Sequence, residues 1–283
     1  MNTYCTTAEI KTYLGVSGTS KDTLIAMLNK MATDELNQML SVNDLALHKV
    51  TGEIHDGCGA TKLVLNDLNV RAIGDIDDDG TAYSQTDPYD VDNYILHLDD
   101  GVFGDKRKVT VDYVAGWDAA GRATITVSIS GLASNATITL GAIATDGFTA
   151  TRGVNWTAQA TDALEAAAIA AYIDAQAGTR AFALGNVVYV VEATNPQVVT
   201  RTLASSDATR LALSAATLSA LDFPESLRLA NMLLVSGLMA RRKNQKVKSY
   251  TIGTKSVTFT SDEDAAEFKR LIAPFQRASV FVI

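Results

Sequence analysis

The chain has 283 residues, 47% hydrophobic and 20% charged, which is the composition of a folded globular protein with room for two domains. Its formal net charge of −8 disfavours a groove wrapped tightly around DNA phosphates, because such binding depends on Lys and Arg. The 2 cysteines have no paired spacing, which argues against a disulfide framework or a zinc site, and neither a signal peptide nor a membrane span is predicted.

Two helices are predicted at the start of the chain. Thr6 and Glu9 form a capping-box pattern, and Gly15 supplies the stop of a short first helix. Ser20 is predicted to cap a longer second helix with one buried apolar face. The residues expected on that face are Leu24, Leu28, Met31, Ala32, Leu36, Met39 and Leu40.

From about His48 the hydrophobic pattern has a period of two, which predicts strands. The expected strands are 62–65, 70–76, 94–98 and 109–114. Asp/Gly-rich turns separate them, so a small antiparallel sheet is expected.

The turn after the second of these strands carries a metal-like pattern. Asp75, Asp77 and Asp79, followed by Gly80, match the first half of a calcium loop. The twelfth position is Thr86, where a calcium loop needs a bidentate Glu. The preferred interpretation is therefore an acidic hairpin turn.

The composition then shifts to Thr, Ala and Ser, with further strands predicted over 122–130, 136–142 and 148–152. Asp162 and Glu165 are predicted to cap an alanine-dominated helix that ends at Gly178. A strand over 187–193 follows the helix, which indicates a small α/β module.

Two more helices are predicted near the end of the chain. Pro224 opens one that runs to about Lys243. A hairpin over 250–259 follows, and Ser261 then caps a final helix that Pro274 ends.

The C-terminal part is a basic island in an acidic chain. From Leu221 onward there are 10 Lys and Arg against 6 Asp and Glu, a net +4, which leaves −12 for the rest. Its basic residues include Arg241, Arg242, Lys243, Lys246 and Lys248. The first three suit the negative end of a helix dipole, and the alternative is a surface that meets DNA or an acidic partner.

Catalytic and metal-binding patterns are absent from the sequence. His48, His55 and His97 share no metal-ligand spacing, and no serine lies in a Gly-x-Ser-x-Gly elbow. We therefore expect a protein that is not an enzyme and that needs no cofactor or metal.

Several short stretches follow one another in a characteristic order. They are 7–15, 56–59, 62–65, 68–73 and 109–117, then 223–230, 240–242, 249–253 and 271–277. In this order they resemble the head-tail connector family of tailed bacteriophages. Members of that family usually pass from the Ala-Gly-aromatic strand, here Ala115-Gly116-Trp117, almost directly to the proline-capped helix.

Residues 119–220 depart from this pattern and are interpreted as an inserted domain. Within it, stretches 185–190 and 206–211 resemble a small α/β module that recurs in phage tail and virion proteins. The expected fold class is α+β, with N-terminal helices, a small antiparallel sheet and C-terminal helices forming a connector domain. The expected domains are 1–118 and 221–283, two parts of the connector domain, with the β-rich α/β insertion at 119–220 between them.

The resemblance implies a structural virion protein at the head-tail interface, assembled in the host cytoplasm. It implies a closed ring of about twelve subunits under the portal protein, through which double-stranded DNA passes and onto which tail or stopper proteins assemble. No membrane partner is expected.

The resemblance implies a role for one set of residues, and the sequence itself suggests roles for two more. Portal binding is carried onto Pro274, Phe275, Gln276, Arg277, Val280, Phe281, Val282 and Ile283. The basic residues from Arg241 to Lys248 would form a face toward a neighbouring subunit or the DNA lumen. Helix packing between subunits is expected at Leu227, Ala230, Leu234 and Leu238, because this helix is apolar nearly all round, a pattern that burial inside a single chain would also give.

Several alternatives stay open on the sequence alone. The apolar tail 280–283 either adds a strand to a partner's sheet or forms an edge strand of its own domain. A tail-completion or tail-tube protein is the alternative within the structural class. A module that binds host-surface glycan through the insertion is the alternative from another class.

Overall fold

The computed structural model describes residues 3–83, 89–98, 102–104, 109–118, 121–142, 147–176, 178–192, 201–218, 222–242, 248–252, 255–259 and 261–276. The fold is α+β, with helices and small antiparallel sheets. The chain divides into two compact units. We call Met1–Leu45 with Phe223–Ile283 the helical unit, and Ala46–Asp222 the sheet unit.

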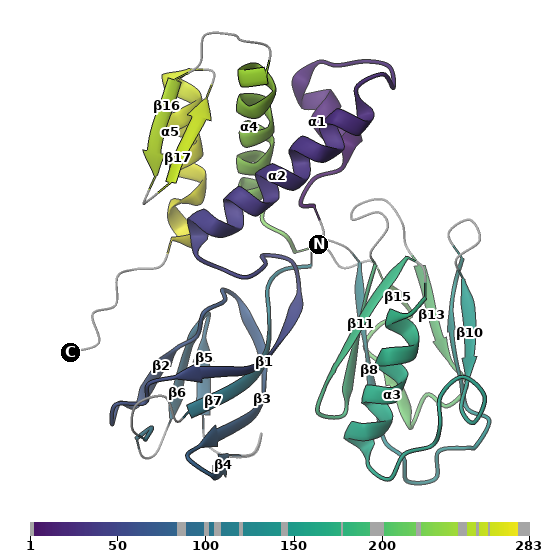
Figure 1. The fold of residues 1–283 in the computed structure, drawn as a ribbon. Helices are drawn as coiled ribbons and strands as arrows, with labels where there is room; N and C mark the ends of the chain where they lie inside the picture. The colour runs from purple at the N-terminus through teal and green to yellow at the C-terminus, as the bar shows by residue number, and fades with distance from the viewer. Residues whose placement is uncertain are drawn as a thin grey trace. The chain divides into compact units, whose positions relative to one another are not determined.

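The helical unit joins the two ends of the sequence. Its elements are α1 (Thr7–Leu14), α2 (Asp22–Leu40), α4 (Glu225–Arg242), the hairpin β16 (Lys248–Ile252) and β17 (Lys255–Phe259), α5 (Asp262–Ile272) and the 3-10 turn η1 (Ala273–Phe275). α4 packs against α1, α2, β17 and α5, so it is the central helix of the unit (Figure 1). Helices from opposite ends of the sequence therefore share one core.

Two of the predicted helix caps in this unit are confirmed. The Thr6 hydroxyl accepts a hydrogen bond from the Glu9 amide, the Glu9 carboxylate accepts one from the Thr6 amide, and Gly15 ends α1 at φ 62°. The Ser261 hydroxyl accepts from the Asp264 amide at the start of α5. These local patterns were sufficient because a cap depends only on neighbouring residues.

The prediction for the start and inner face of α2 was partly wrong. The residue before the helix is Lys21, and no side chain caps the helix there, so Ser20 is not the cap. Met31 is 49% exposed, although Leu28, Ala32 and Leu36 are buried as expected. The inner face is rotated because it also takes in three polar side chains, Asn29, Thr33 and Asn37.

Two of those polar side chains, Asn29 and Thr33, form a buried link between the two chain ends. Asn231 of α4 donates from Nδ2 to Asn29 Oδ1 at 2.7 Å, and Asn29 Nδ2 donates to the Cys5 carbonyl at 2.7 Å. The Thr33 hydroxyl lies 3.4 Å from Asn231 Oδ1, its acceptor. Because buried polar groups are costly unless paired, this chain of bonds favours one alignment of α2 against α4.

The first part of the sheet unit holds two small antiparallel sheets. One has the order β1-β7-β3-β4, built from β1 (His48–His55), β7 (Val109–Ala115), β3 (Val70–Asp78) and β4 (Thr81–Tyr83). The other has the order β2-β6-β5, from β2 (Lys62–Val64), β6 (Ile95–Leu98) and β5 (Tyr89–Asp92). Their apolar side chains form a common core that includes Leu65, Leu96, Phe103 and Val111.

The Asp79-Gly80 turn between β3 and β4 is the predicted acidic hairpin. Asp78 pairs with Thr81 across it, and both Asp79 (φ 53°) and Gly80 (φ 87°) have positive φ, as a two-residue hairpin requires. The Gly80 amide donates to Asp77 Oδ1 at 2.7 Å. The interpretation as a turn is confirmed.

Residues 122–218 hold a large buried apolar cluster of their own, and a smaller cluster joins Leu184, Tyr189 and Val191 of this segment to Leu47 and Val114. Sheet β11-β12-β8-β14 consists of β11 (Thr179–Leu184), β12 (Val187–Glu192), β8 (Arg122–Val127) and β14 (Leu211–Leu213). Sheet β10-β9-β13-β15 consists of β10 (Phe148–Thr151), β9 (Thr137–Leu140), β13 (Arg201–Ser205) and β15 (Thr217–Leu218). Helix α3 (Asp162–Asp174) packs against β8, β11 and β12 (Figure 1). The buried apolar cluster of this segment draws all its members from 123–218.

The predicted cap of α3 was wrong. The Thr161 hydroxyl accepts from the Leu164 amide, whereas Asp162 accepts from the Ile129 amide at 2.8 Å and Glu165 is fully buried. The helix also ends at Asp174, before the expected Gly178. Glu165 shares the inner face with Ile169 and Ile173, and its carboxylate accepts from the Gln159 amide before the helix instead of from an amide of the first turn.

The expected limits 1–118, 119–220 and 221–283 differ from the compact units, whose boundaries fall after Leu45 and after Asp222. The compact units reflect which residues contact one another, and they do not test whether a segment was inserted into an older domain. Those limits therefore stay a prediction.

Candidate functional site

The two ends of segment 119–220 are joined by a cluster of charged side chains, which we call the junction cluster: Arg71, Asp118, Arg122 and Asp222. The Asp118 amide donates to Asp222 Oδ1 at 2.6 Å. The Arg71 guanidinium pairs with the Asp222 carboxylate, and its Nε donates to the Gly116 carbonyl at 3.1 Å. Arg122 Nε lies 3.1 Å from Asp118 Oδ2. The chain thus leaves β7 and returns at Asp222 through adjacent, hydrogen-bonded residues.

The electrostatics of the junction cluster centre on Asp118. Burial raises the pKa of this carboxyl to about 6, with a smaller upward contribution from Asp222, and the cations Arg122 and Arg71 only partly offset the shift. Its Oδ1 atom has no hydrogen-bond partner among the residues that the structure describes. The ionised form of Asp118 is therefore unfavourable in the folded state.

We expect Asp118 to make the fold less stable as the pH rises. Between its ordinary pKa of 3.8 and the folded value of about 6, the folded state binds more protons than the unfolded state. The free energy of unfolding should therefore fall over that interval, by about 2–3 kcal/mol, and then level off. In an Asp118→Asn variant this decline should be absent, so the variant minus wild-type difference should grow from pH 4 to pH 6.

Urea denaturation across this pH range measures the difference. Asp75→Asn, which changes an exposed carboxylate on β3, is the control and should give a flat difference. A flat difference for Asp118→Asn as well would contradict the assigned burial of its charge.

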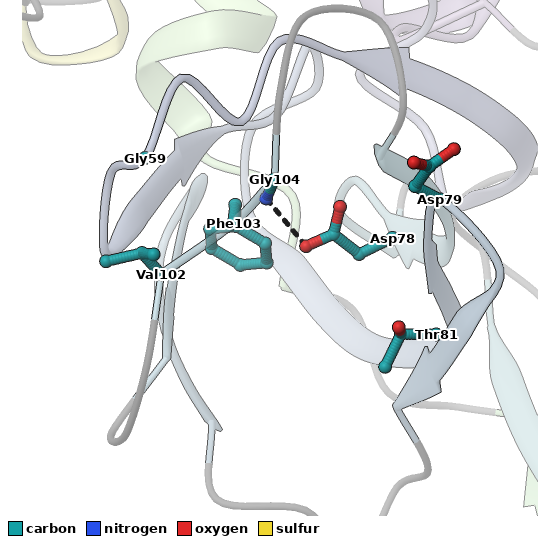
Figure 2. A pocket seen from close by; sticks show the side chains of 7 residues that line it. All are labelled: Gly59, Asp78, Asp79, Thr81, Val102, Phe103 and Gly104. Carbon is teal, nitrogen blue, oxygen red and sulfur yellow. Dashed lines mark hydrogen bonds between the residues drawn. The ribbon is translucent and has the colours of Figure 1, made fainter.

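A pocket of about 500 Å³ opens beside the β3–β4 hairpin (Figure 2). Its lining residues are Gly59, Asp78, Asp79, Thr81, Val102, Phe103 and Gly104. Asp78 is only 7% exposed, and its Oδ2 accepts a hydrogen bond of 2.7 Å from the Gly104 amide, the dashed line in Figure 2. Phe103 is fully buried beside it, whereas Val102 is 54% exposed. The pocket therefore combines a buried carboxylate with an apolar wall.

Asp78 is a buried pocket residue that the sequence pattern of β3 could have identified. Side chains alternate across a strand, and in β3 Asp75 and Asp77 are exposed whereas Ile76 and Asp78 are buried. The calcium-like pattern drew attention to the three exposed aspartates. Asp78 comes two residues after the apolar Ile76, so the alternation of side chains along a strand would have placed it on the same inner face.

A second group of titratable residues links β1 to β7. The Tyr113 hydroxyl donates to Glu53 Oε2 at 2.6 Å and lies 3.4 Å from Asp67 Oδ2. His55 Nε2 lies 2.6 Å from Glu53 Oε1, and His48 Nε2 lies 3.2 Å from Asp67 Oδ2. Burial favours the neutral acid, but hydrogen bonds from His55 and Tyr113 hold the pKa of Glu53 below its usual value. Burial and the bond to Glu53 raise the pKa of Tyr113. These contacts place each of the two carboxylates of this group next to a histidine and the Tyr113 hydroxyl.

The residues expected to bind a portal lie partly within the described chain. Pro274 and Phe275 belong to η1, directly after α5, and Gln276 follows them. Pro274 and Gln276 are exposed, and Phe275 is half-buried. Arg277, Val280, Phe281, Val282 and Ile283 lie outside the described residues. Their role stays a prediction.

The expected basic face is described only at its start. Arg241 and Arg242 are exposed in the last turn of α4. Their positive charges can stabilise the negative end of the helix dipole or bind an acidic partner. Lys243 and Lys246 lie outside the described residues, as does the side chain of Lys248 at the start of β16.

The apolar residues expected to pack between subunits lie on α4. Leu227, Ala230 and Leu234 are buried within the helical unit, and Leu238 is half-buried. In a single chain the first three already pack against its own elements. Their proposed contact with a neighbouring subunit stays a prediction.

Within the described part of the chain, no group of three or more His, Cys, Asp or Glu side chains is placed to hold a metal ion. Among the same residues, no helix has the length and apolar character needed to cross a membrane.

In comparisons with known proteins, the sequence matches no protein-family model and no curated protein.

Proposed function

We propose that this chain is a structural protein of a tailed-phage particle, a head-tail connector that docks as a ring under the portal. The observation that carries the proposal is the junction cluster. The Asp118 amide bonds to Asp222, so the residues that flank segment 119–220 are adjacent, and most buried apolar residues of that segment form a cluster of their own. This is the arrangement expected when a domain is inserted into a loop of a connector, because the host chain remains continuous in space.

The organisation of the helical unit is a second support. In it, α1 and α2 from the start of the chain share a core with α4 and α5 from its end. The resemblance to connectors rests on stretches in both of these regions. Their common core is consistent with one connector domain interrupted by the intervening chain.

The charge distribution suits a conduit for DNA. Weak net repulsion lets a phosphate backbone pass, whereas a strongly basic channel would hold it. The chain is acidic overall, with its net positive part confined to residues 221–283. We place the exposed Arg241 and Arg242 toward the lumen or toward an acidic surface of the portal.

Binding to the portal tests the proposal. The intact protein should co-sediment with portal assemblies of the same phage, and a chain cut after Gln276 should bind at least about tenfold more weakly. The cut leaves η1 in place, so an unchanged circular dichroism spectrum and melting temperature would show that the fold persists.

An Arg241→Gln, Arg242→Gln variant of the intact chain separates the basic helix end from the tail. If neither the intact nor the shortened chain binds the portal, the connector proposal falls. If both bind equally, the docking role of the tail falls while the connector proposal stands.

A further inference from the structure

We propose that the pocket beside the β3–β4 hairpin binds a cationic side chain, an arginine or a lysine, of a partner polypeptide. This proposal goes beyond the connector function and does not depend on it. It rests on the buried carboxylate of Asp78, on the apolar wall next to that carboxylate and on the size of the pocket.

Among the residues that the structure describes, only one oxygen of the Asp78 carboxylate accepts a hydrogen bond. Its Oδ2 accepts the Gly104 amide at 2.7 Å, whereas Oδ1 has no hydrogen-bond partner among the residues that the structure describes. A buried carboxylate oxygen without a donor is unfavourable, and a charged N–H group is the donor that binds it most strongly. Figure 2 shows this side chain turned toward Val102, Phe103 and Gly104, on the inside of the pocket.

The backbone leaves room for the carboxylate only because residue 104 is a glycine. A Cβ atom at Gly104 would lie 2.4 Å from Asp78 Oδ1, which is closer than any stable contact. The free oxygen therefore lies directly over the Gly104 backbone. Both oxygens of the Asp78 carboxylate therefore lie against Gly104.

The lining residues fit a charged group on an alkyl chain better than a metal ion. A calcium ion takes six to eight oxygen ligands, whereas the lining of this pocket includes the apolar residues Val102 and Phe103. The volume of about 500 Å³ lies in the range of sites for organic groups. The stem of an arginine or lysine can lie along the exposed Val102, with its charged end at Asp78 and the rim residue Asp79 nearby.

The net charge of this part of the chain also favours a cationic ligand. Residues 1–220 carry a net −12, so a cationic group is attracted to this part of the chain and an anionic group is repelled. A polypeptide is the source we commit to, because its side chain supplies the cation and the apolar stem together.

The test titrates the full chain with a blocked tripeptide, acetyl-Gly-Arg-Gly-amide. Binding is measured from the NMR chemical shifts of the Gly104 and Gly59 amides. We expect saturable shifts of both signals. The same peptide with citrulline in place of arginine, which keeps the shape and removes the charge, should bind about tenfold more weakly or worse. Equal binding of the two peptides would overturn the proposal.

Variants locate the binding. Asp78→Asn keeps an oxygen for the Gly104 amide and removes the charge, so it should weaken binding about tenfold. Asp75→Asn, an exposed carboxylate on the same strand, should leave binding unchanged. Val102→Lys, at an exposed position that should not disturb folding, places an ammonium group at the rim and should also abolish peptide binding. Equal effects of Asp75→Asn and Asp78→Asn would contradict the site.

Two further arms distinguish other occupants. If calcium chloride saturates the Gly104 and Gly59 signals and the arginine peptide does not, the pocket is a metal site and the proposal fails. Basic residues follow Gly104 in the sequence at Lys106, Arg107 and Lys108. Peptide binding that occurs only after all three are changed to Gln would show that this chain fills its own pocket, which also overturns the proposal.

Discussion

Replacing Glu165 with alanine is expected to lower the free energy of unfolding of the sheet unit by about 3–5 kcal/mol. Glu165 is fully buried and accepts three hydrogen bonds, from Arg152 Nε at 2.8 Å, from Trp156 Nε1 at 2.7 Å and from the Gln159 amide at 2.6 Å. Its removal would leave the buried Arg152 guanidinium with the Leu132 carbonyl as an uncharged partner. An unpaired buried charge is among the most destabilising changes in a protein core.

Urea denaturation followed by the fluorescence of Trp117 and Trp156 measures this effect, because the Trp156 indole lies at the altered site. Leu164→Ala is the matched control, since Leu164 is the preceding residue of α3 and is 53% exposed. Glu165→Gln keeps the acceptor oxygen and loses the charge, so its effect should fall between the two. A loss below about 1 kcal/mol for Glu165→Ala would show that Arg152 finds another partner.

Replacing Asn231 with alanine is expected to destabilise the helical unit by about 2–3 kcal/mol. The change removes the bond to Asn29 and leaves Asn29 Oδ1 buried without its donor. It also removes the acceptor of the Thr33 hydroxyl. The effect should be large because these bonds join α2 and α4 in the interior, across 202 residues of sequence.

A double-mutant cycle with Asn29→Ala isolates the link. We expect a coupling of about 1 kcal/mol between positions 29 and 231 in thermal or urea unfolding. Met31→Ala, on the exposed side of α2, should be close to neutral. Additive losses at Asn29 and Asn231 would mean that the pair does not hold the two chain ends together.

Local features of the fold were predictable from the sequence, and the reason is their short range. The capping box of Thr6 and Glu9, the cap at Ser261 and the Asp79-Gly80 turn each depend on residues within one helical turn or hairpin. The strands over 62–64 and 109–115 follow from the period-two pattern.

Long-range arrangements were not predictable in the same way. β7 lies between β1 and β3, and β9 pairs with β13 across an intervening helix and three strands. No local pattern specifies such pairings, because they depend on which apolar faces meet in the folded chain. The hydrogen bond between Asp118 and Asp222 is of this kind.

The buried polar residues were misread for a different reason. The sequence pattern predicts that Glu165 caps a helix, and Asp78 lies unnoticed within a calcium-like pattern. Both predictions follow from the expectation that charged residues lie at the surface. Their spacing relative to Ile169 and Ile76 carried the correct information. Periodicity was the better guide to burial at these positions than residue type.

The most direct test of the connector proposal is negative-stain imaging of portal assemblies mixed with the intact protein. The proposal predicts an additional ring of density on the tail-facing side of the portal, coaxial with its channel and open at the centre. The ring should be missing when the chain is cut after Gln276. Portal particles that remain unchanged with the intact protein in excess would contradict the proposal.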